Sequence, residues 1–379
     1  MKLLAIVMAL FLILRAILPC TFKWYYKVLL SLAAAAASFK FFIFVMISGS
    51  SDIFAPNLPV VVQHIGTAIY CLTFTYFALL VVAEAVRLIY CLIQKSLGRK
   101  LSNIFRENAN RANLILLGVA VLLTGIGLVA GAVLPSVREH TIEIERLPKE
   151  ADGLRILVLS DIHIEKTTSA QYVKDLVVLA NKQKPDVICL LGDMVDGRVK
   201  DIGEKVALLG ELKATTVVYG IPGNHEYFSG YGSWMKFFRS IGVRMLANEA
   251  EIIDGVIFAG ITDKAARPRK LPVPDVVKAV GSGGKTNPVI LFSHRPEHVT
   301  AAAKQNVDLQ VSGHTHGGII WGIDLLVGLV NGGYHSGFYN VGNTRLYVSN
   351  GTGIWRGLPM RLGHNSEITL FILKSPKKQ

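Results

Sequence analysis

The chain has 379 residues, 51% of them hydrophobic, and a formal net charge of +13. This length predicts two or three domains. The excess of Lys and Arg lies mostly in the apolar first third of the chain. This distribution favours membrane-flanking charge and argues against nucleic-acid binding, which needs a basic patch on a globular part. The 4 cysteines have no metal-type spacing and predict no disulfide framework.

Four apolar stretches come first along the chain, at residues 3–18, 28–47, 60–93 and 114–134. A helix needs about 20 apolar residues to span a bilayer, and the last three stretches reach this length. The first stretch is shorter, so a signal peptide is the alternative there. Arg15 inside the stretch and the lack of a small-residue cleavage site favour a retained helix. We therefore expect an all-α transmembrane domain of about four helices over residues 1–134.

Lys and Arg in the short loops predict the orientation of these helices. The loop at residues 94–112 is rich in basic residues and the first loop holds Lys23 and Lys27, whereas residues 49–59 contain only Asp52 as a charged residue. If the basic loops face the cytoplasm, the chain leaves the fourth helix on the opposite side. We expect a multi-pass integral membrane protein with an extracytoplasmic C-terminal domain, on the periplasmic or extracellular side.

The remaining chain has the pattern of a layered α/β fold. Residues 135–152 are expected to form a linker, in which residues 141–145 alternate like a strand. After it, short apolar runs indicate strands at residues 154–160, 186–191, 216–219, 256–260, 289–292 and 309–312. Helical apolar spacing occurs at residues 169–182, 199–212 and 233–240. Strands that alternate with helices predict a layered α/β domain over residues 153–379, with its functional groups just beyond the strand ends.

Five polar motifs each follow an apolar run: Asp161-Ile162-His163, Gly192-Asp193-Met194-Val195-Asp196, Gly223-Asn224-His225-Glu226, Ser293-His294 and Gly313-His314-Thr315-His316. A single His-x-His pair is common on protein surfaces. Five motifs in this order resemble those of the calcineurin-like metallophosphoesterases, in a membrane-anchored branch with N-terminal transmembrane helices. The resemblance covers residues 153–373, and Arg361 and Glu367 fit the closing pattern of that branch. It implies an α/β/β/α metallophosphoesterase sandwich.

The same resemblance implies a binuclear metal centre. One divalent ion is expected to bind Asp161, His163 and His316. The other is expected to bind Asn224, His294 and His314, with Asp193 bridging both ions. Carboxylate, amide and imidazole ligands suit Mn, Fe, Co or Zn. Two such ions roughly 3.5–4 Å apart can bind phosphoryl oxygens and provide hydroxide near neutral pH.

Four neighbouring residues have expected roles beside the ions. The resemblance implies that His225 is the general acid for the leaving group, a role that suits histidine near neutral pH. Glu226 is expected either to orient His225 or to cap the segment that follows. Asp196 is expected to support the site. Arg295 is expected either to contact the substrate phosphate or to face solvent.

The apolar, glycine-punctuated stretch at residues 317–330 is too short to span a bilayer. It is interpreted either as buried loop and strand packing or as an exposed apolar lip beside the metals, facing the membrane. Tyr334, His335 and Tyr339 are expected on the same rim.

These observations predict a membrane-anchored, metal-dependent phosphoesterase. It is expected to hydrolyse a phosphodiester or pyrophosphate bond, with a lipid-linked substrate and membrane lipids as partners and no nucleic acid. One alternative is a metal-binding transport or binding protein without hydrolase activity. The full ligand set with His225 argues against it, because a structural metal site closes its coordination sphere. A cytoplasmic-facing lipid-A-pathway pyrophosphatase is the alternative if the topology is inverted. A nuclease is a lesser alternative, because the sequence shows no basic groove interleaved with aromatic residues.

Overall fold

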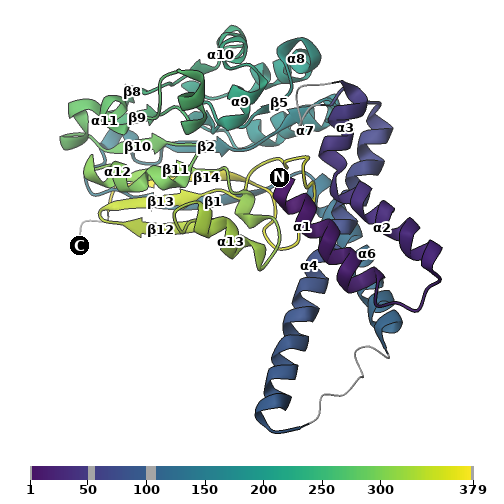
Figure 1. The fold of residues 1–379 in the computed structure, drawn as a ribbon. Coiled ribbons are helices and arrows are strands. Elements are labelled where there is room, and N and C mark those ends of the chain that lie inside the picture. Colours follow the sequence, from purple (N-terminus) through teal and green to yellow (C-terminus); the bar gives the residue numbers. More distant parts are fainter. Residues whose placement is uncertain (1, 50–55, 100–107, 377–379) are drawn as a thin grey trace. The chain divides into compact units, whose positions relative to one another are not determined.

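The computed structural model describes residues 2–49, 56–99 and 108–376. They form two compact units (Figure 1). We call the first the helical unit; it comprises Met1–Ala130 with the short segment Arg356–Met360. The second, the α/β unit, comprises Gly131–Trp355 and Arg361–Gln379.

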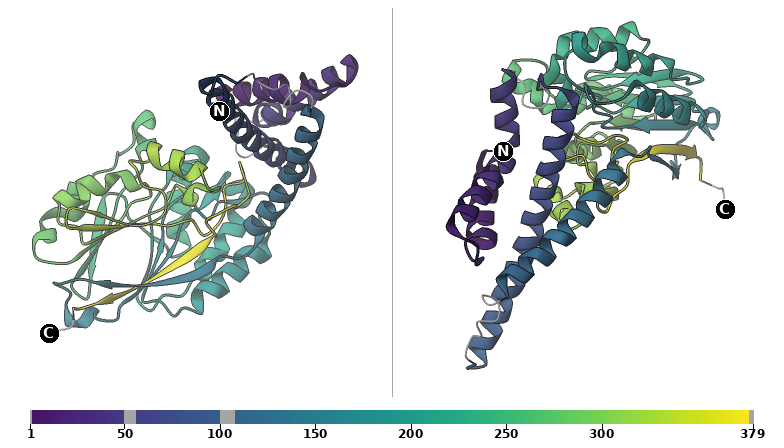
Figure 2. Two further views of the ribbon diagram at one scale, coloured as in Figure 1. Left: turned by 90° about the horizontal axis from the view of Figure 1, so that it is seen from below. Right: turned by 90° about the vertical axis from the view of Figure 1, so that its right-hand side faces the viewer.

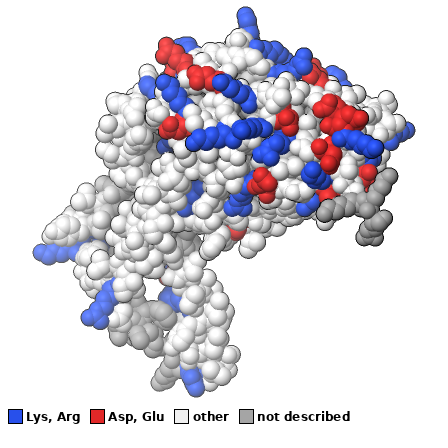
Figure 3. Space-filling view, turned by 180° about the vertical axis from the view of Figure 1, so that it is seen from behind, with Lys and Arg blue, Asp and Glu red and all other residues white. Residues whose placement is uncertain are grey.

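The helical unit contains two helices long and apolar enough to cross a membrane, α4 (Val60–Ser96) and α6 (Ala109–Ala132). Their Leu, Ile and Val side chains are largely exposed on the chain itself, as expected of a surface that lipid covers. On the visible face, the space-filling view shows scattered Lys and Arg but almost no Asp or Glu on the helices, whereas both signs are interspersed over the α/β unit (Figure 3). The other helical elements are α1 (Lys2–Leu12), a π-helical turn (Ile13–Ile17), α2 (Trp24–Ser38) and α3 (Lys40–Ser48).

The expected straight helix over residues 28–47 is instead broken, because α2 and α3 meet at 75°. Lys40 lies directly after the break and is buried. Its ammonium donates to the Thr67 hydroxyl at 3.1 Å and lies 4.2 Å and 5.0 Å from the ring centroids of Phe41 and Tyr70. A lysine in an apolar segment needs such partners, and the bend brings Lys40 to them.

The expectation of four spanning helices is thus not met in the described part of the chain, which holds two candidate spans, or three if the bent pair counts as one. The first apolar stretch forms only the 11-residue helix α1 and the turn after it. Residues 50–55 and 100–107, on which part of the predicted orientation depends, lie outside the described residues.

The α/β unit contains two six-stranded sheets. The first has the order β1-β14-β2-β4-β6-β7, with strands at Ser136–Glu143, Glu367–Lys374, Arg155–Leu159, Val187–Leu190, Val217–Gly220 and Arg244–Met245. The second has the order β12-β13-β11-β10-β9-β8, with strands at Gly337–Val341, Thr344–Val348, Leu309–Ser312, Val289–Phe292, Val256–Gly260 and Glu249–Ile253. A two-stranded sheet pairs β3 (Ile164–Glu165) with β5 (Val195–Asp196).

The two sheets pack face to face, with helices on their outer faces (Figures 1 and 2). Strand β2 shows why: Ile156 and Val158 join the core between the sheets, while Leu157 and Leu159 pack under the outer helices. Strands buried on both faces read as continuous apolar runs, which is the pattern in the sequence. The first sheet is covered by α7 (Ala170–Asn181), α8 (Val199–Ala207) and α10 (Tyr231–Ser240), and the second by α11 (Val276–Val280) and α12 (Val299–Lys304).

The segment expected as a linker contributes a full strand. Residues Ser136–Glu143 form β1, which pairs in parallel with the C-terminal strand β14 along its whole length, from Ser136 opposite Glu367 to Glu143 opposite Lys374. Strand β14 is therefore clamped between β1 and β2. The first and last strands of the α/β unit, β1 and β14, thus lie side by side at one edge of its first sheet.

Candidate metal centre

The carboxyl ends of strands from both sheets bring the predicted site residues to one place. Asp161 and His163 follow β2, and Asp193 follows β4. The two loops are joined by backbone bonds, with Asp161 N donating to Gly192 O at 3.1 Å and His163 N to Asp193 O at 3.0 Å. The remaining predicted residues arrive from the other strand ends: Asn224 to Glu226 at the start of α9 (Asn224–Ser229), His294 and Arg295 after β10, and His314 and His316 after β11.

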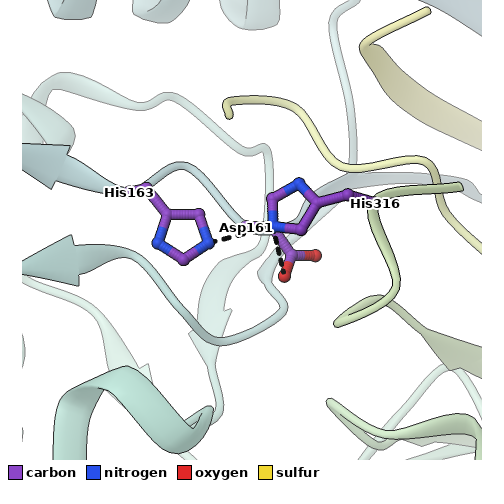
Figure 4. A group of neighbouring side chains, drawn as sticks. All are labelled: Asp161, His163 and His316. Atoms are coloured by element: carbon purple, nitrogen blue, oxygen red, sulfur yellow. Dashed lines mark hydrogen bonds and ion pairs between the residues drawn. The ribbon is translucent and has the colours of Figure 1, made fainter. Parts of the chain in front are cut away.

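Asp161, His163 and His316 form a buried group that can hold a metal ion (Figure 4). The Nε2 atoms of His163 and His316 lie 3.1 Å apart, and Asp161 Oδ1 is 3.7 Å from His316 Nε2. A carboxylate oxygen and two imidazole nitrogens directed at one point have the chemistry of ligands that share a cation. The Ser160 hydroxyl and the His314 backbone N–H both donate to the Asp161 carboxylate and so fix its direction.

Asp193, His294 and His314 form a second such group. His294 Nδ1 is 2.9 Å from the Leu191 carbonyl oxygen, which can only accept, so Nδ1 carries the proton and Nε2 presents its lone pair. That buried Nε2 lies 3.1 Å from Asp193 Oδ2 but makes no hydrogen bond with any described residue. An unsatisfied lone pair beside a carboxylate oxygen fits a divalent ion that both would bind.

Asp196 links the first group to His225. One carboxylate oxygen lies 3.0 Å from His163 Nδ1, and the other contacts His225 Nδ1. Burial opposes ionisation of Asp196, but the two histidines hold its pKa well below its usual range. The carboxylate therefore holds both rings by their Nδ1 atoms, which leaves each Nε2 for the pocket. The expectation that Asp196 supports the site stays a prediction, and these contacts agree with it.

His225 is placed beside the groups rather than in the Asp193 group. Its backbone N–H donates to Asp193 Oδ1 at 2.8 Å, and its Nε2 is 3.9 Å from Asp193 Oδ2. Burial lowers the pKa of His225, but the carboxylates of Asp196 and Asp193 outweigh this effect and raise it to about 10. The imidazole is therefore protonated at neutral pH, as a general acid must be.

Glu226 joins two loops of the site. Its buried carboxylate accepts three backbone N–H bonds, from Gly223 at 2.7 Å, Asp193 at 3.0 Å and Met194 at 2.7 Å. The bond to Gly223 caps the start of α9, which is one of the two roles expected. The bonds from Asp193 and Met194 additionally hold the loop that carries a predicted metal ligand. No pattern in the sequence indicates these two bonds.

Arg295 is held inside the site instead of facing solvent. Its Nε donates to Asp263 Oδ2 at 2.7 Å, and its two terminal nitrogens lie 2.9 Å from Asn224 Oδ1 and 2.5 Å from His314 Nε2. A cation bound by Asn224 and His314 would need these same lone pairs, so the guanidinium would have to turn toward the substrate. Asp263 was missed by sequence reasoning, although it follows the end of strand β9 as the other site residues follow theirs.

The backbone at the site is strained. Asp161, His163, Asp193, His314 and His316 all have positive φ, between 50° and 70°. Such values are uncommon for residues other than glycine and concentrate at functional sites. Glycine is required at the first position of two motifs because there is no room for a side chain: a Cβ at Gly313 would overlap the Ser160 hydroxyl, and one at Gly223 would overlap the Asp193 carboxylate.

Arg361 and Glu367, which fit the closing sequence pattern, make buried hydrogen bonds to the segments next to the site. The buried Arg361 guanidinium donates to the carbonyl oxygens of His316 at 3.2 Å, Asn350 at 2.7 Å and Gly353 at 2.8 Å. Glu367 accepts from the Tyr347 hydroxyl at 2.6 Å and from Asn350 Nδ2 at 3.0 Å. The His316 loop is therefore fixed by long-range contacts.

The apolar stretch after His316 forms an exposed helix, α13 (Ile323–Val330). The side chains of Leu325, Leu326, Leu329 and Val330 are 62–76% exposed, and Trp321 is 72% exposed. The interpretation of this stretch as buried packing is therefore wrong for α13. Tyr334 and Tyr339 pack against each other, with ring centroids 4.9 Å apart.

Two face-to-face sheets with buried His and Asp groups at their strand ends form a site that can hold metal ions. Residues 154–318 match the family model of the calcineurin-like phosphoesterases. An uncharacterized metallophosphoesterase of Helicobacter pylori is 32% identical over 271 residues, which cover 70% of this chain and 72% of that protein. The chain belongs to the calcineurin-like metallophosphoesterase family, as its motifs predicted.

Two further relatives extend the comparison. A Campylobacter jejuni metallophosphoesterase is 31% identical over 81% of this chain and 80% of its own length. A zebrafish "Transmembrane protein with metallophosphoesterase domain" is 34% identical over 70% of this chain and 63% of its own length. The prediction of a family branch with N-terminal membrane helices is thus confirmed.

Proposed function

We propose that this protein is a membrane-anchored phosphoesterase that uses two metal ions to hydrolyse a phosphodiester or pyrophosphate bond in a lipid-linked substrate. The observation that carries the proposal is the pair of buried groups, Asp161-His163-His316 and Asp193-His294-His314, with His225, the expected general acid, at their side. A site that only binds metal has no use for that acid.

Asp161, His163 and His316 would hold one ion, and Asn224, His294 and His314 the other, with Asp193 between them. Bound ions of the Mn, Fe, Co or Zn type supply Lewis acidity and a hydroxide nucleophile near neutral pH. His225 donates its Nε2 proton to the leaving-group oxygen, while Asp196 holds Nδ1 and stabilises the charged ring. Arg295 turns from Asn224 and His314 to a phosphoryl oxygen, still anchored by Asp263.

The exposed apolar surface on α13 supports a lipid-linked substrate. Helix α13 begins seven positions after His316, so the surface and the site belong to one stretch of chain. An exposed apolar patch of this kind marks a contact surface, and the chain also holds candidate membrane spans. We infer that α13 inserts into the bilayer surface and lets the site act on a phosphoester at headgroup level.

Replacing Leu325 and Leu326 with serine is expected to lower the rate on lipid-linked substrates at least about tenfold, since burying one leucine contributes ~1.5–3 kcal/mol. The rate on soluble bis-p-nitrophenyl phosphate should not change. The substrates are found by mass spectrometry of lipid extracts incubated with the wild-type protein and with Asp193→Asn. Serine at Ile252 and Val277, exposed apolar residues elsewhere in the α/β unit, is the matched control. Equal losses on both substrate types would contradict a role of α13 in lipid engagement.

We further propose that the α/β unit is extracytoplasmic in a multi-pass protein, from the basic loops flanking the apolar segments. The test is labelling of Lys304→Cys, at the exposed end of α12, with a membrane-impermeant maleimide in intact cells or spheroplasts. Labelling without lysis is expected. Labelling only after lysis would indicate the opposite orientation and favour a cytoplasmic-facing pyrophosphatase instead.

A further inference from the structure

A further group of metal-ligating side chains lies in the α/β unit and has no part in the proposed mechanism. Asp324, His335 and His364 each bring one ligating atom within 4.8 Å of the other two. Asp324 Oδ2 and His364 Nε2 are 3.4 Å apart, and the rings of His335 and His364 have centroids 6.0 Å apart. An ordinary ion pair needs only the first two residues, so the second histidine needs an explanation.

The backbone brings the three residues together from separate segments. Asp324 lies in the first turn of α13, and His335 follows the turn that ends it. His364 comes from residues 361–366, directly before β14, which we call the closing segment. This segment pairs with the chain ahead of α13: Trp321 N donates to Leu362 O, and Leu362 N to Ile319 O, each at 2.9 Å. The juxtaposition is therefore fixed by main-chain bonds and does not depend on side-chain rotamers alone.

Other hydrogen bonds orient the three residues. Asp324 Oδ1 accepts from the N–H groups of Gly322 and Leu325, both at 2.9 Å, which leaves Oδ2 directed at His364. The His335 carbonyl accepts from the Thr315 hydroxyl at 2.7 Å, and the His364 carbonyl from Arg361 at 3.0 Å. The bonds to Asp324 orient its carboxylate as outer bonds do in known metal sites, and the bonds to the two carbonyls hold the backbone that carries the histidine rings. The side chains of Asp324 and His364 are 14% and 26% exposed, so an ion can reach them.

We propose that Asp324, His335 and His364 bind a third divalent transition-metal ion, which ties both ends of α13 to the closing segment. Two imidazoles and one carboxylate suit Zn²⁺, Co²⁺ or Fe²⁺ better than Mg²⁺ or Ca²⁺. A tetrahedral ion with bonds of roughly 2.0–2.2 Å separates its ligand atoms by about 3.3–3.6 Å, which matches the Asp324–His364 distance. Water completes the coordination. The ion-binding proposal does not depend on the proposed function.

The test is the metal content of the full-length protein in detergent, loaded with Co²⁺, desalted, and measured by plasma mass spectrometry and visible absorption. His364→Ala and His335→Ala are each expected to lose one ion per chain. An Asp161→Ala/Asp193→Ala double variant, which removes ligands of both proposed catalytic ions, is expected to keep one ion, and adding His364→Ala should remove it. His298→Ala, a histidine outside all these groups, is the matched control and should change nothing.

Circular dichroism of each variant shows whether the fold is kept, and the His335 variant provides a second measurement if His364→Ala unfolds. Co²⁺ content unchanged by either histidine substitution would overturn the third site. Hydrolysis of soluble substrate tests the proposed function separately, because it depends on Asp193 and not on His364.

Discussion

Asparagine in place of Asp193 is expected to abolish hydrolysis, with a loss of kcat/KM of at least about 10³-fold, because the bound ions supply several kcal/mol of transition-state stabilisation. Asp193 Oδ2 lies 3.1 Å from His294 Nε2, and Oδ1 accepts the His225 backbone N–H at 2.8 Å. An asparagine amide fills the same space but carries no negative charge and directs hydrogens at one ligand position. Metal affinity should therefore fall together with activity.

The measurement compares metal content and hydrolysis of bis-p-nitrophenyl phosphate in the purified wild type and variant. Asp201→Asn, an exposed aspartate on α8, removes the same charge away from the site and should leave both quantities unchanged. Normal metal content and normal turnover in Asp193→Asn would show that hydrolysis does not take place at the proposed metal centre.

His225→Ala is expected to lower kcat by about 10²–10⁴-fold while the metal content stays normal, because a positioned general acid contributes on that scale. The bond from His225 to Asp193 comes from the backbone N–H and survives the substitution. Burial lowers the pKa of His225, but Asp196 and Asp193 outweigh it and raise the pKa to about 10. The acid form is the active one, so wild-type activity is expected to fall as the pH rises through the pKa of His225.

Two readouts separate the acid role from a structural one. The variant should lose far more activity on substrates with alkyl leaving groups than on nitrophenyl substrates, whose leaving groups need no proton. The variant should also lack the fall in activity at alkaline pH that deprotonation of His225 causes in the wild type. The same loss on both leaving groups, with an unchanged pH profile, would rule out proton donation by His225.

Much of the α/β unit could be predicted because its strands are buried on both faces. The apolar run at residues 154–160 becomes β2, and the run at 186–191 becomes β4, since a strand covered by a sheet on one side and helices on the other has no polar positions. The motif order then located the strand ends, and the structure brings Asp161 next to His316 across more than 150 positions.

Other features depend on partners that no local pattern reveals. The role of Arg295 is decided by Asp263, Asn224 and His314, which lie on other strands and loops. Strand β1 forms in the expected linker because β14 supplies its hydrogen bonds, and Lys40 has partners on α4, Thr67 among them. Each outcome is a long-range contact whose energy exceeds the local preference of the segment.

By itself, the sequence determined which residue types are available at each strand end, which segments are apolar enough for membrane or core, and the family to which the chain belongs. The tertiary structure decided which lone pairs face one another, that Glu226 binds three backbone N–H groups, and that α13 exposes its leucines beside the Asp324-His335-His364 group. The reason is physical: periodicity along a chain reports burial, whereas coordination and hydrogen bonding depend on directions between residues far apart in sequence.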